Sequence, residues 1–525
     1  MQALEDTRQK KKERKKGNTA KAARSQAAFV LPALAAVKVL PASTKGVLCD
    51  KTLCRWNSRF AEEDLMKKAS IFSAALLVLA FVLLGWAMSS NTAPEAPSGF
   101  DNHTIDPNFV PQSVHAADQT QFDTVEQAEK DGLGPIYNAQ SCRECHQNPT
   151  SGAVSQVTEL RVGHLSPGSL FESPNIPIDH GREVITGRTL INDRAICPEI
   201  QEHVPAIETI RTRRLAVNTL GDGFIEAVAD DTLLSISKDQ CRSTHRKICG
   251  QALRVPVVES VGETAVGRFG WKDQHASLLS FSGDAYLNEM GITNRLFPTE
   301  VTSICNPKSV TEPNDQPDPT DHLEDIDHFA RFMRASKVPP RDETLAVTEA
   351  AKRGSKVFAR IGCAICHLPT LTTAKAGTKV NGGQFTIPDA LGEKTFHSYS
   401  DFLLHNVGTG DGIAIAVVEH YAVPAASVQA LYKSKQSAQV SFDEVDKIMN
   451  RRGFSYKAVH DGRNKIRTAP LWGLRTHSRF MHDGDSVRLG DAIVRHKGEA
   501  SEVTEKFRRL TPTEQKDLLS FLNSL

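Results

Sequence analysis

The segment SCRECHQNPT places two cysteines and a histidine within five positions, at Cys142, Cys145 and His146. In a Cys-x-x-Cys-His motif the two thiols can add across the two vinyl groups of one haem. The histidine that follows is then held where its imidazole can ligate the iron. The spacing therefore predicts a covalently attached c-type haem, with His146 as an axial ligand of its iron.

The same spacing returns in GCAICHLPTL, at Cys363, Cys366 and His367. A chain of this composition should contain the motif by chance only roughly 0.006 times, so coincidence is a poor explanation for two copies. A zinc ribbon needs its two halves about 15 to 20 residues apart and makes no use of the adjacent histidines. A thioredoxin-like redox pair requires neither the histidine nor a second copy. We therefore expect two covalent haems.

An export signal is predicted at residues 66–90, where two lysines precede an apolar run that ends in small and polar residues. This order is typical of a secretory signal peptide or a short membrane anchor. Since such segments normally begin a chain, we interpret residues 1–65 as an over-extended gene start or a disordered tail. Either way the rest of the protein is expected in the periplasm, where cytochromes c are matured, and inner-membrane anchoring stays open.

The composition is that of an ordinary globular protein. Of the 525 residues 40% are apolar and 24% are charged, and the formal net charge is +1. A charge so close to zero gives no reason to expect a nucleic acid as partner.

Four further cysteines follow the export signal and belong to neither haem motif. In an oxidising compartment an even number of cysteines favours two disulfides, with three pairings open. These cysteines are Cys197, Cys241, Cys249 and Cys305.

The elements that must position the motifs are expected to be helices joined by long irregular loops. Apolar periodicity predicts helices near 122–131, 346–360, 489–497 and 511–524. An aromatic residue stands five positions before each motif, at Tyr137 and Phe358, which indicates an internal duplication. We therefore predict a mainly α fold of two cytochrome c-like haem domains. The first spans 91–335 and carries insertions, the second spans 340–525, and a proline- and aspartate-rich linker lies at 306–322.

A second axial ligand for the haem at His367 is predicted on the helix near 489–497. One face of that helix carries residues at i, i+3, i+4 and i+7, namely Leu489, Ala492, Ile493 and His496. This spacing predicts that His496 points inward. A hydrogen-bonded core histidine is the alternative, and His482, next to Met481, is a competing ligand.

Three segments, together with the two motifs, resemble one known family. The segments are GRFGWKDQHASLLSFSGDAYLNEMGITNRLFPTE, YSDFLLHNVGTGDG and IRTAPLWGLRTHSRFMHDGDSVRLGDAIVRHKGEA. They are similar to the dihaem oxidoreductase family, also described as thiol oxidoreductase-like. That family is related to the bacterial dihaem cytochrome c peroxidases and to the dihaem enzyme that matures methylamine dehydrogenase.

The resemblance implies roles for several residues. It makes His496 the sixth ligand of the haem held by His367, a bis-histidine pair that is harder to reduce than a histidine–methionine pair. For the haem at His146 it points to Trp271 as the tryptophan between the haems, and to Glu289 as the glutamate over an open iron face.

Three further points follow from the same resemblance. The glutamine that the peroxidases carry between these two residues has no clear counterpart, because residues 280–282 read Ser-Phe-Ser. This departure weighs against peroxide turnover. His164 is an alternative sixth ligand that would close the site. Thr468 and Pro470 match a segment that supplies backbone oxygens to a calcium ion.

The sequence thus predicts a periplasmic dihaem oxidoreductase. Electrons would enter from a small redox protein at the haem of His367 and His496 and pass, by way of Trp271, to the haem of His146. There a small oxidant such as peroxide is reduced, or a substrate is oxidised. A dihaem electron carrier without catalysis is the alternative, and a modifier of a protein partner is a third reading.

Overall fold

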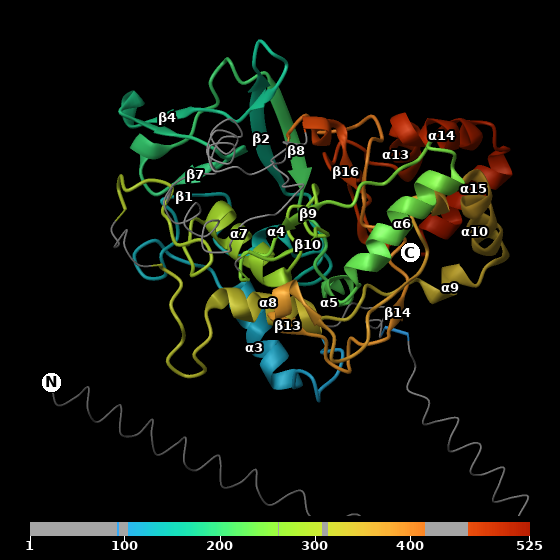
Figure 1. Ribbon diagram of the computed structural model, residues 1–525, viewed down its shortest axis with the longest axis horizontal. Helices are drawn as coiled ribbons and strands as arrows, with labels where there is room; N and C mark the ends of the chain where they lie inside the picture. The colour runs from blue at the N-terminus through green and yellow to red at the C-terminus, as the bar shows by residue number, and fades with distance from the viewer. Residues whose placement is uncertain (1–91, 94–102, 261, 307–312, 415–459) are drawn as a thin grey trace, which may run out of the picture. The chain divides into compact units, whose positions relative to one another are not determined.

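The computed structural model describes residues 92–93, 103–260, 262–306, 313–414 and 460–525 (Figure 1). All of them belong to one compact unit, Ser90–Leu525, which contains both Cys-x-x-Cys-His motifs. The predicted tail at 1–65 and the signal or anchor at 66–90 lie outside the described residues. Among the residues that are described, no helix is both long and apolar enough to cross a membrane.

Helical residues, 3-10 turns included, make up 33% of the described residues, and strand residues make up 15%. The helices are α3 Gln112–Asp123, α4 Cys142–Cys145, α5 Asp222–Glu226, α6 Asp230–Ser243, α7 Leu278–Met290, α8 Asp325–Ala335, α9 Glu343–Ala346, α10 Glu349–Ile361, α13 Leu489–Arg495, α14 Ser501–Arg508 and α15 Pro512–Leu522. The prediction of a mainly α fold built by internal duplication is therefore wrong, because many small sheets contribute and no duplication is shown.

The largest sheet lies between the two motifs in the sequence. Its long antiparallel pair joins β2 (Thr158–Leu165) to β8 (Ile210–Leu215), in a register that runs from Thr158 opposite Leu215 to Gly163 opposite Ile210. The short strands β3 (Phe171–Glu172) and β6 (Leu190–Ile191) also pair with β2. Isoleucine and valine side chains of this region form a small core of their own. Such β-branched residues fit a pleated, half-buried surface.

The other sheets are two-stranded and short. They pair β1 (Ile136–Tyr137) with β7 (Arg194–Ala195), β4 (Ile176–Ile178) with β5 (Glu183–Ile185), β9 (Arg254–Pro256) with β10 (Thr264–Val266), β11 (Leu371–Thr372) with β14 (Thr395–Phe396), β12 (Lys379–Val380) with β13 (Phe385–Thr386), and β15 (Leu404–His405) with β16 (Ile466–Arg467). A strand of two or three residues is too short to show alternation in the sequence. That is the physical reason why these short strands were missed.

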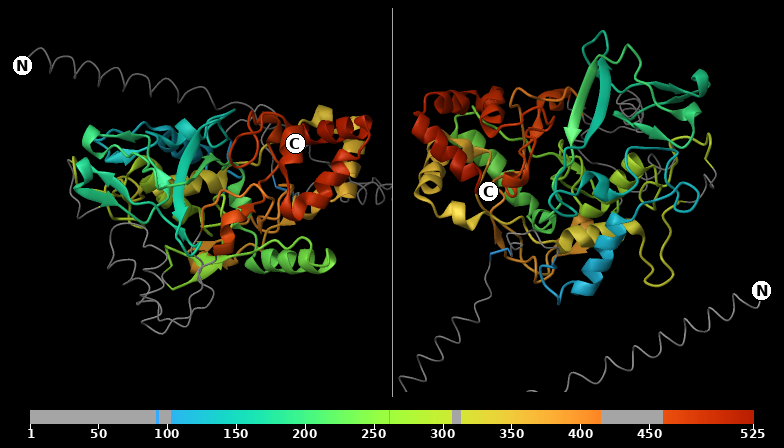
Figure 2. Two further views of the ribbon diagram at one scale, coloured as in Figure 1. Left: turned by 90° about the horizontal axis from the view of Figure 1, so that it is seen from above. Right: turned by 180° about the vertical axis from the view of Figure 1, so that it is seen from behind.

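The helix pair α10 and α15 carries the second motif. The two helices pack along each other (Figure 1), and Figure 2 shows them side by side in both further views. Phe358 of α10 and Phe521 of α15 meet with ring centroids 5.3 Å apart. Helix α10 begins at a Thr348 cap and ends at Gly362, which takes φ +107°, a conformation that favours glycine. The chain can therefore turn directly into Cys363.

A second core surrounds the first motif. Helices α3 and α7 both pack against α8, and Phe122 of α3 contacts Phe329 and Phe332 of α8 with ring centroids 6.1 and 5.0 Å apart. The helices expected near 346–360, 489–497 and 511–524 are present as α10, α13 and α15. The helix expected at 122–131 is wrong, since α3 ends at Asp123 and the chain beyond it is irregular.

Candidate functional site

The second motif is held by a short turn at the end of α10. Residues Cys363–Ile365 form a 3-10 turn, and the His367 backbone N–H donates to the Cys363 carbonyl at 3.0 Å. The His367 ring is held from its other side, because Nδ1 donates to the Tyr399 carbonyl at 3.0 Å. This bond fixes the tautomer that leaves Nε2 with its lone pair, the form of histidine that ligates metals.

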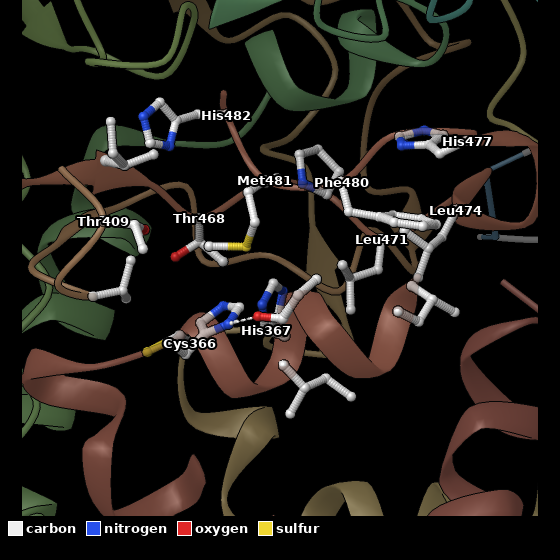
Figure 3. Close-up of a pocket in the computed structure, with 18 of the residues that line it drawn as sticks. Cys366, His367, Thr409, Thr468, Leu471, Leu474, His477, Phe480, Met481 and His482 are labelled. Atoms are coloured by element: carbon white, nitrogen blue, oxygen red, sulfur yellow. Dashed lines mark hydrogen bonds between the residues drawn. The ribbon is translucent and has the colours of Figure 1, made fainter. Parts of the chain in front are cut away.

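A large cavity opens beside this motif. It offers about 230 Å³ to the centres of water molecules, and its wall includes Cys363, Cys366, His367 and His496. A single water needs only about 10 to 15 Å³ by the same measure, so the space suits a much larger group. Figure 3 shows Cys366 and His367 on one side, with Leu471, Leu474, Phe480 and Met481 lining the space across from them.

His496 lies on this cavity wall, at the C-terminal end of α13. Its Nδ1 donates to the Ala492 carbonyl at 2.8 Å, which leaves Nε2 free in the same way as in His367. Burial lowers the pKa of His367 to about 4, and the nearby His496 imidazole lowers it further. Burial also lowers the pKa of His496. Both imidazoles are therefore neutral near pH 7 and able to bind a metal.

Three other candidate side chains line the same cavity: His477, Met481 and His482. The Met481 side chain points into the space above Cys366 and His367 (Figure 3). The His482 ring is 4% exposed and lies edge-on to the Trp271 ring, with centroids 6.1 Å apart. His477 has its pKa lowered to about 4 by burial, and the sequence reading missed it. The structure thus brings His496 and its competitor to one site.

Trp271 also lies on this cavity wall. Its Nε1 donates to the Leu215 carbonyl at 2.8 Å. The residues that follow, 216–218, line the cavity as well, and the backbone of Val217 comes close enough to the His146 ring to affect its pKa. A short segment therefore connects the wall of the second site to the histidine of the first.

The first motif forms the short helix α4, and the His146 backbone N–H donates to the Cys142 carbonyl at 3.0 Å. The His146 ring lies 6.1 Å from the Phe122 ring, and burial lowers its pKa to about 4. The Nδ1 atom of His146 is buried without a hydrogen-bond partner among the described residues. His146 is therefore also a neutral imidazole.

Glu289 lies next to this first motif. Its Oε2 accepts a hydrogen bond from Asn138 Nδ2 at 2.8 Å, and burial together with the neighbouring Glu289 raises the pKa of the Cys145 thiol to about 12. Helix α7 can end here because Gly291 takes φ +70°, and a Cβ at that position would lie 2.6 Å from the Ile136 carbonyl oxygen. The Glu-Met-Gly segment is thus folded tightly against the chain that leads into Cys142.

A second carboxylate, which the sequence reading missed, adjoins Glu289. Burial and the charge of Glu159 raise the pKa of Glu289 well above its ordinary value. Although burial opposes it, the ion pair with Arg161 lowers the pKa of Glu159 to about 2; the guanidinium donates to both carboxylate oxygens, at 2.8 and 2.9 Å. The arrangement therefore favours a proton on Glu289 while Glu159 stays ionised. The only sequence signal was alternation, because Glu159 and Arg161 share one face of β2.

Both ring nitrogens of His164, the alternative sixth ligand, face carboxylates. Its Nδ1 lies 2.9 Å from Glu208 and its Nε2 lies 3.2 Å from Glu172. The hydrogen bond to Glu208 raises the pKa of His164. This arrangement favours the protonated ring, in which neither nitrogen offers a lone pair to a metal.

The remaining cysteines pair as two disulfides, Cys197–Cys305 and Cys241–Cys249. The expected number of disulfides is confirmed, and the structure selects one of the three pairings. The four motif cysteines are free thiols.

The comparison with protein families is decisive. The model of the family described as "Di-haem oxidoreductase, putative peroxidase" matches residues 205–419 and 451–525, more than half of the chain. The chain belongs to the di-haem oxidoreductase family. The first motif lies before the matched residues.

Two solved structures are similar over part of their length. A hydrazine synthase chain from Kuenenia stuttgartiensis is 19% identical with a TM-score of 0.20, and the match covers 38% of this chain and 55% of that one. A MauG-like protein associated with microbial copper homeostasis is 15% identical with a TM-score of 0.26, covering 58% and 89%. This chain thus spans about half the length of the hydrazine synthase chain. No protein with a curated function matches the sequence.

The haem cofactors of this di-haem oxidoreductase fit the second site. Two free thiols and a neutral imidazole lie on the wall of one cavity, and a second neutral imidazole lies on the same wall. Arg467 and Arg479 also line the cavity, and their positive charge suits the carboxylate groups of a haem. Thr468 and Pro470, the predicted calcium segment, border the cavity as well, and the Thr468 carbonyl accepts a hydrogen bond from Ser400 Oγ at 2.6 Å. Calcium stays a prediction.

Proposed function

We propose that this di-haem oxidoreductase is an exported, periplasmic enzyme with two covalently attached c-type haems. Cys363 and Cys366 would hold one haem between His367 and His496, and the Cys142–His146 motif would hold the other. A small redox protein delivers electrons at the haem of His367. Peroxide is reduced, or a substrate is oxidised, at the haem of His146.

One observation carries this proposal. His367 and His496 line one cavity, and each Nδ1 is bonded to a backbone carbonyl, at 3.0 and 2.8 Å. Backbone bonds of this kind fix both rings with Nε2 unprotonated, which is how metal-bound histidines are usually held. A histidine that only packs in the core needs neither a second histidine on the wall of the same cavity nor two free thiols beside it.

A bound haem supplies an iron that exchanges single electrons and can bind a small oxidant. The protein must supply the protons, because reducing peroxide to two waters consumes two electrons and two protons. Glu289 is suited to this task, since its raised pKa favours the protonated acid and its Asn138 bond fixes one carboxyl oxygen. Glu159 keeps the proton on Glu289 by staying ionised beside it.

The route between the two sites runs through Trp271 and the segment that follows Leu215. Trp271 donates to the Leu215 carbonyl, and the backbone at Val217 reaches the His146 ring. This connection supports Trp271 as a positioning residue between the haems.

The alternative function is a dihaem electron carrier without catalysis. A carrier needs no acid beside the haem of His146. The raised pKa of Glu289, next to the ionised Glu159, therefore favours an enzyme. An enzyme that modifies a protein partner would use the same site around His146 and Glu289, with a different substrate.

The ferric spin state of the purified holoprotein separates the enzyme from the carrier. We expect one low-spin haem, from His367 and His496, and one high-spin haem at His146, where His164 is engaged by carboxylates. Two low-spin haems would instead identify a carrier, and a protein without covalent haem would end the proposal altogether.

A further inference from the structure

A buried cluster around His405 has no role in the function described so far. His405 lies in β15 and is 1% exposed, yet both of its ring nitrogens face carboxylates. Nε2 lies 2.9 Å from an Asp401 oxygen and Nδ1 lies 3.0 Å from a Glu499 oxygen. The cluster therefore sandwiches one imidazole between two acids.

The two acids are held by donors from other parts of the chain. Asp401 accepts from Gln240 Nε2 at 2.6 Å and from the Leu403 backbone N–H at 3.0 Å. Since an amide nitrogen can only donate, Asp401 is an acceptor toward both, and its Oδ2 also faces His405.

Glu499 is held in the same way. It accepts backbone N–H bonds from Cys249 at 2.8 Å and from Asn406 at 3.0 Å, in addition to the bond from His405. Although burial opposes it, the facing Asp401 and Glu499 side chains and the Cys366 thiol raise the pKa of His405 well above its ordinary value, which favours a proton on each ring nitrogen. The cluster thus holds one positive and two negative charges, a net charge of −1.

The surrounding backbone is built to admit this ring. Gly250 stands beside it, and a Cβ there would lie 2.7 Å from His405 Nε2. The disulfide Cys241–Cys249 ends next to Gly250 and places the Cys249 N–H against Glu499. Three segments remote in sequence therefore meet to enclose one cation.

The cluster borders the second haem site directly. His405 lines the same cavity as His367 and His496, and its Nδ1 lies 3.7 Å from Cys366 Sγ. An interior has a low effective dielectric, so a charge there acts strongly on a neighbouring redox centre. Adding an electron to an iron is favoured by a nearby positive charge and disfavoured by a negative one.

We propose that His405 is a positioning residue that sets the reduction potential of the haem held by Cys363, Cys366 and His367. Its imidazolium offsets one of the two carboxylate charges and so keeps the potential of this bis-histidine haem higher than it would otherwise be. The proposal rests on the proposed function, because it concerns the haem at that site.

The test is the midpoint potential of the low-spin haem, measured by spectroelectrochemical titration of the holoprotein at pH 8. His405→Gln leaves the cluster at −2 and should lower the potential. The double variant H405Q/E499Q returns the cluster to −1, and its potential should move back toward that of the wild type.

A merely structural role makes the opposite prediction for the double variant. Two substitutions in one buried cluster would then disturb the haem more than one, and the potential would move further in the same direction. That result, or an unchanged potential in His405→Gln with the low-spin spectrum intact, would overturn the inference. Absence of a low-spin haem in the wild type would instead defeat the proposed function, and the inference with it.

Discussion

His367 and His496 line one cavity, and each donates its Nδ1–H to a main-chain carbonyl, that of Tyr399 and that of Ala492. The two bonds come from unrelated parts of the chain, the loop after the second motif and the helix α13. They orient both rings without any side-chain partner. The site is therefore preorganised for ligation on both rings, and haem insertion need not reorganise the helix that carries His496.

The two motifs should bind haem independently, since they lie on separate elements, α4 and the turn after α10. We expect Cys142→Ser and Cys363→Ser each to lose the thioether at one site only. Mass spectrometry of the exported protein and of its tryptic peptides would show this. Loss of both haems from either variant would contradict independent attachment.

Glu289→Gln should slow the reaction with peroxide, because the variant keeps the shape of the side chain but cannot give up a proton. A positioned acid or base contributes about 10² to 10⁴ in rate, and a loss of that order is expected while both haem spectra are kept. Stopped-flow kinetics would measure it. Unchanged kinetics would show that Glu289 is not the acid.

Glu159→Gln is the matched control for that experiment. It removes the negative charge that helps to keep the proton on Glu289, so the pKa of Glu289 should fall. The protonated form is then lost at lower pH, and the alkaline limit of the peroxide reaction should move downward without a large loss of the maximal rate. A pH–rate profile identical to that of the wild type would argue against the carboxylate pair.

The free energy of unfolding should fall in acid because of the buried His115. This histidine is fully buried in α3, stacks on Phe332, and neither ring nitrogen has a hydrogen-bond partner among the described residues. Burial lowers its pKa to about 4 from the ordinary 6.5. The unfolded chain therefore binds the proton more tightly than the folded one. The contribution of neutral His115 to the free energy of unfolding is fully present above about pH 6.5 and is lost as the pH falls toward 4.

The variant His115→Phe removes this titration. Since one pKa unit corresponds to about 1.4 kcal/mol, the variant should gain about 2 kcal/mol over the wild type at pH 5, relative to their difference at pH 8. Urea unfolding at the two pH values measures the gain. A matched substitution of an exposed histidine, His203→Gln, is the control for the effect of changing a histidine. An equal difference at both pH values would exclude His115 as the cause.

The two disulfides should differ in their effect on stability. Cys197 and Cys305 are 108 residues apart, whereas Cys241 and Cys249 are 8 apart. On the chain-entropy account, removing the long cross-link with paired serines costs about 5 kcal/mol and removing the short one about 2.5 kcal/mol. Denaturant unfolding of the two double variants would compare them. A larger loss from the short loop would show that its contacts with Glu499 outweigh loop entropy.

The sequence predicted the elements that carry their own signal. Helices α10 and α15 have capping threonines at Thr348 and Thr511 and a strong apolar stripe, so their positions were clear. Helix α3 was displaced in the prediction because its buried face consists of His115, Asp118 and Phe122. Two polar residues on that face concealed the period that marks a buried stripe.

The site was predictable only where neighbours in sequence are neighbours in space. Cys-x-x-Cys-His is local, and the Glu-Met-Gly segment identified Glu289. Glu159, which determines the protonation of Glu289, comes from a strand 130 positions earlier. His405 likewise meets Glu499 from 94 residues away. Such pairings depend on tertiary packing, and no local pattern records them.

The most direct test of the account is the ferric spin state of His496→Ala, compared with that of His482→Ala. If His496 is the sixth ligand of the haem at His367, its removal should convert that haem from low-spin to high-spin or water-ligated. His482→Ala should leave the haem low-spin, since His482 lies against Trp271. Electron paramagnetic resonance of both variants decides the matter. A low-spin haem that persists in His496→Ala, or that is lost only in His482→Ala, would contradict the bis-histidine site.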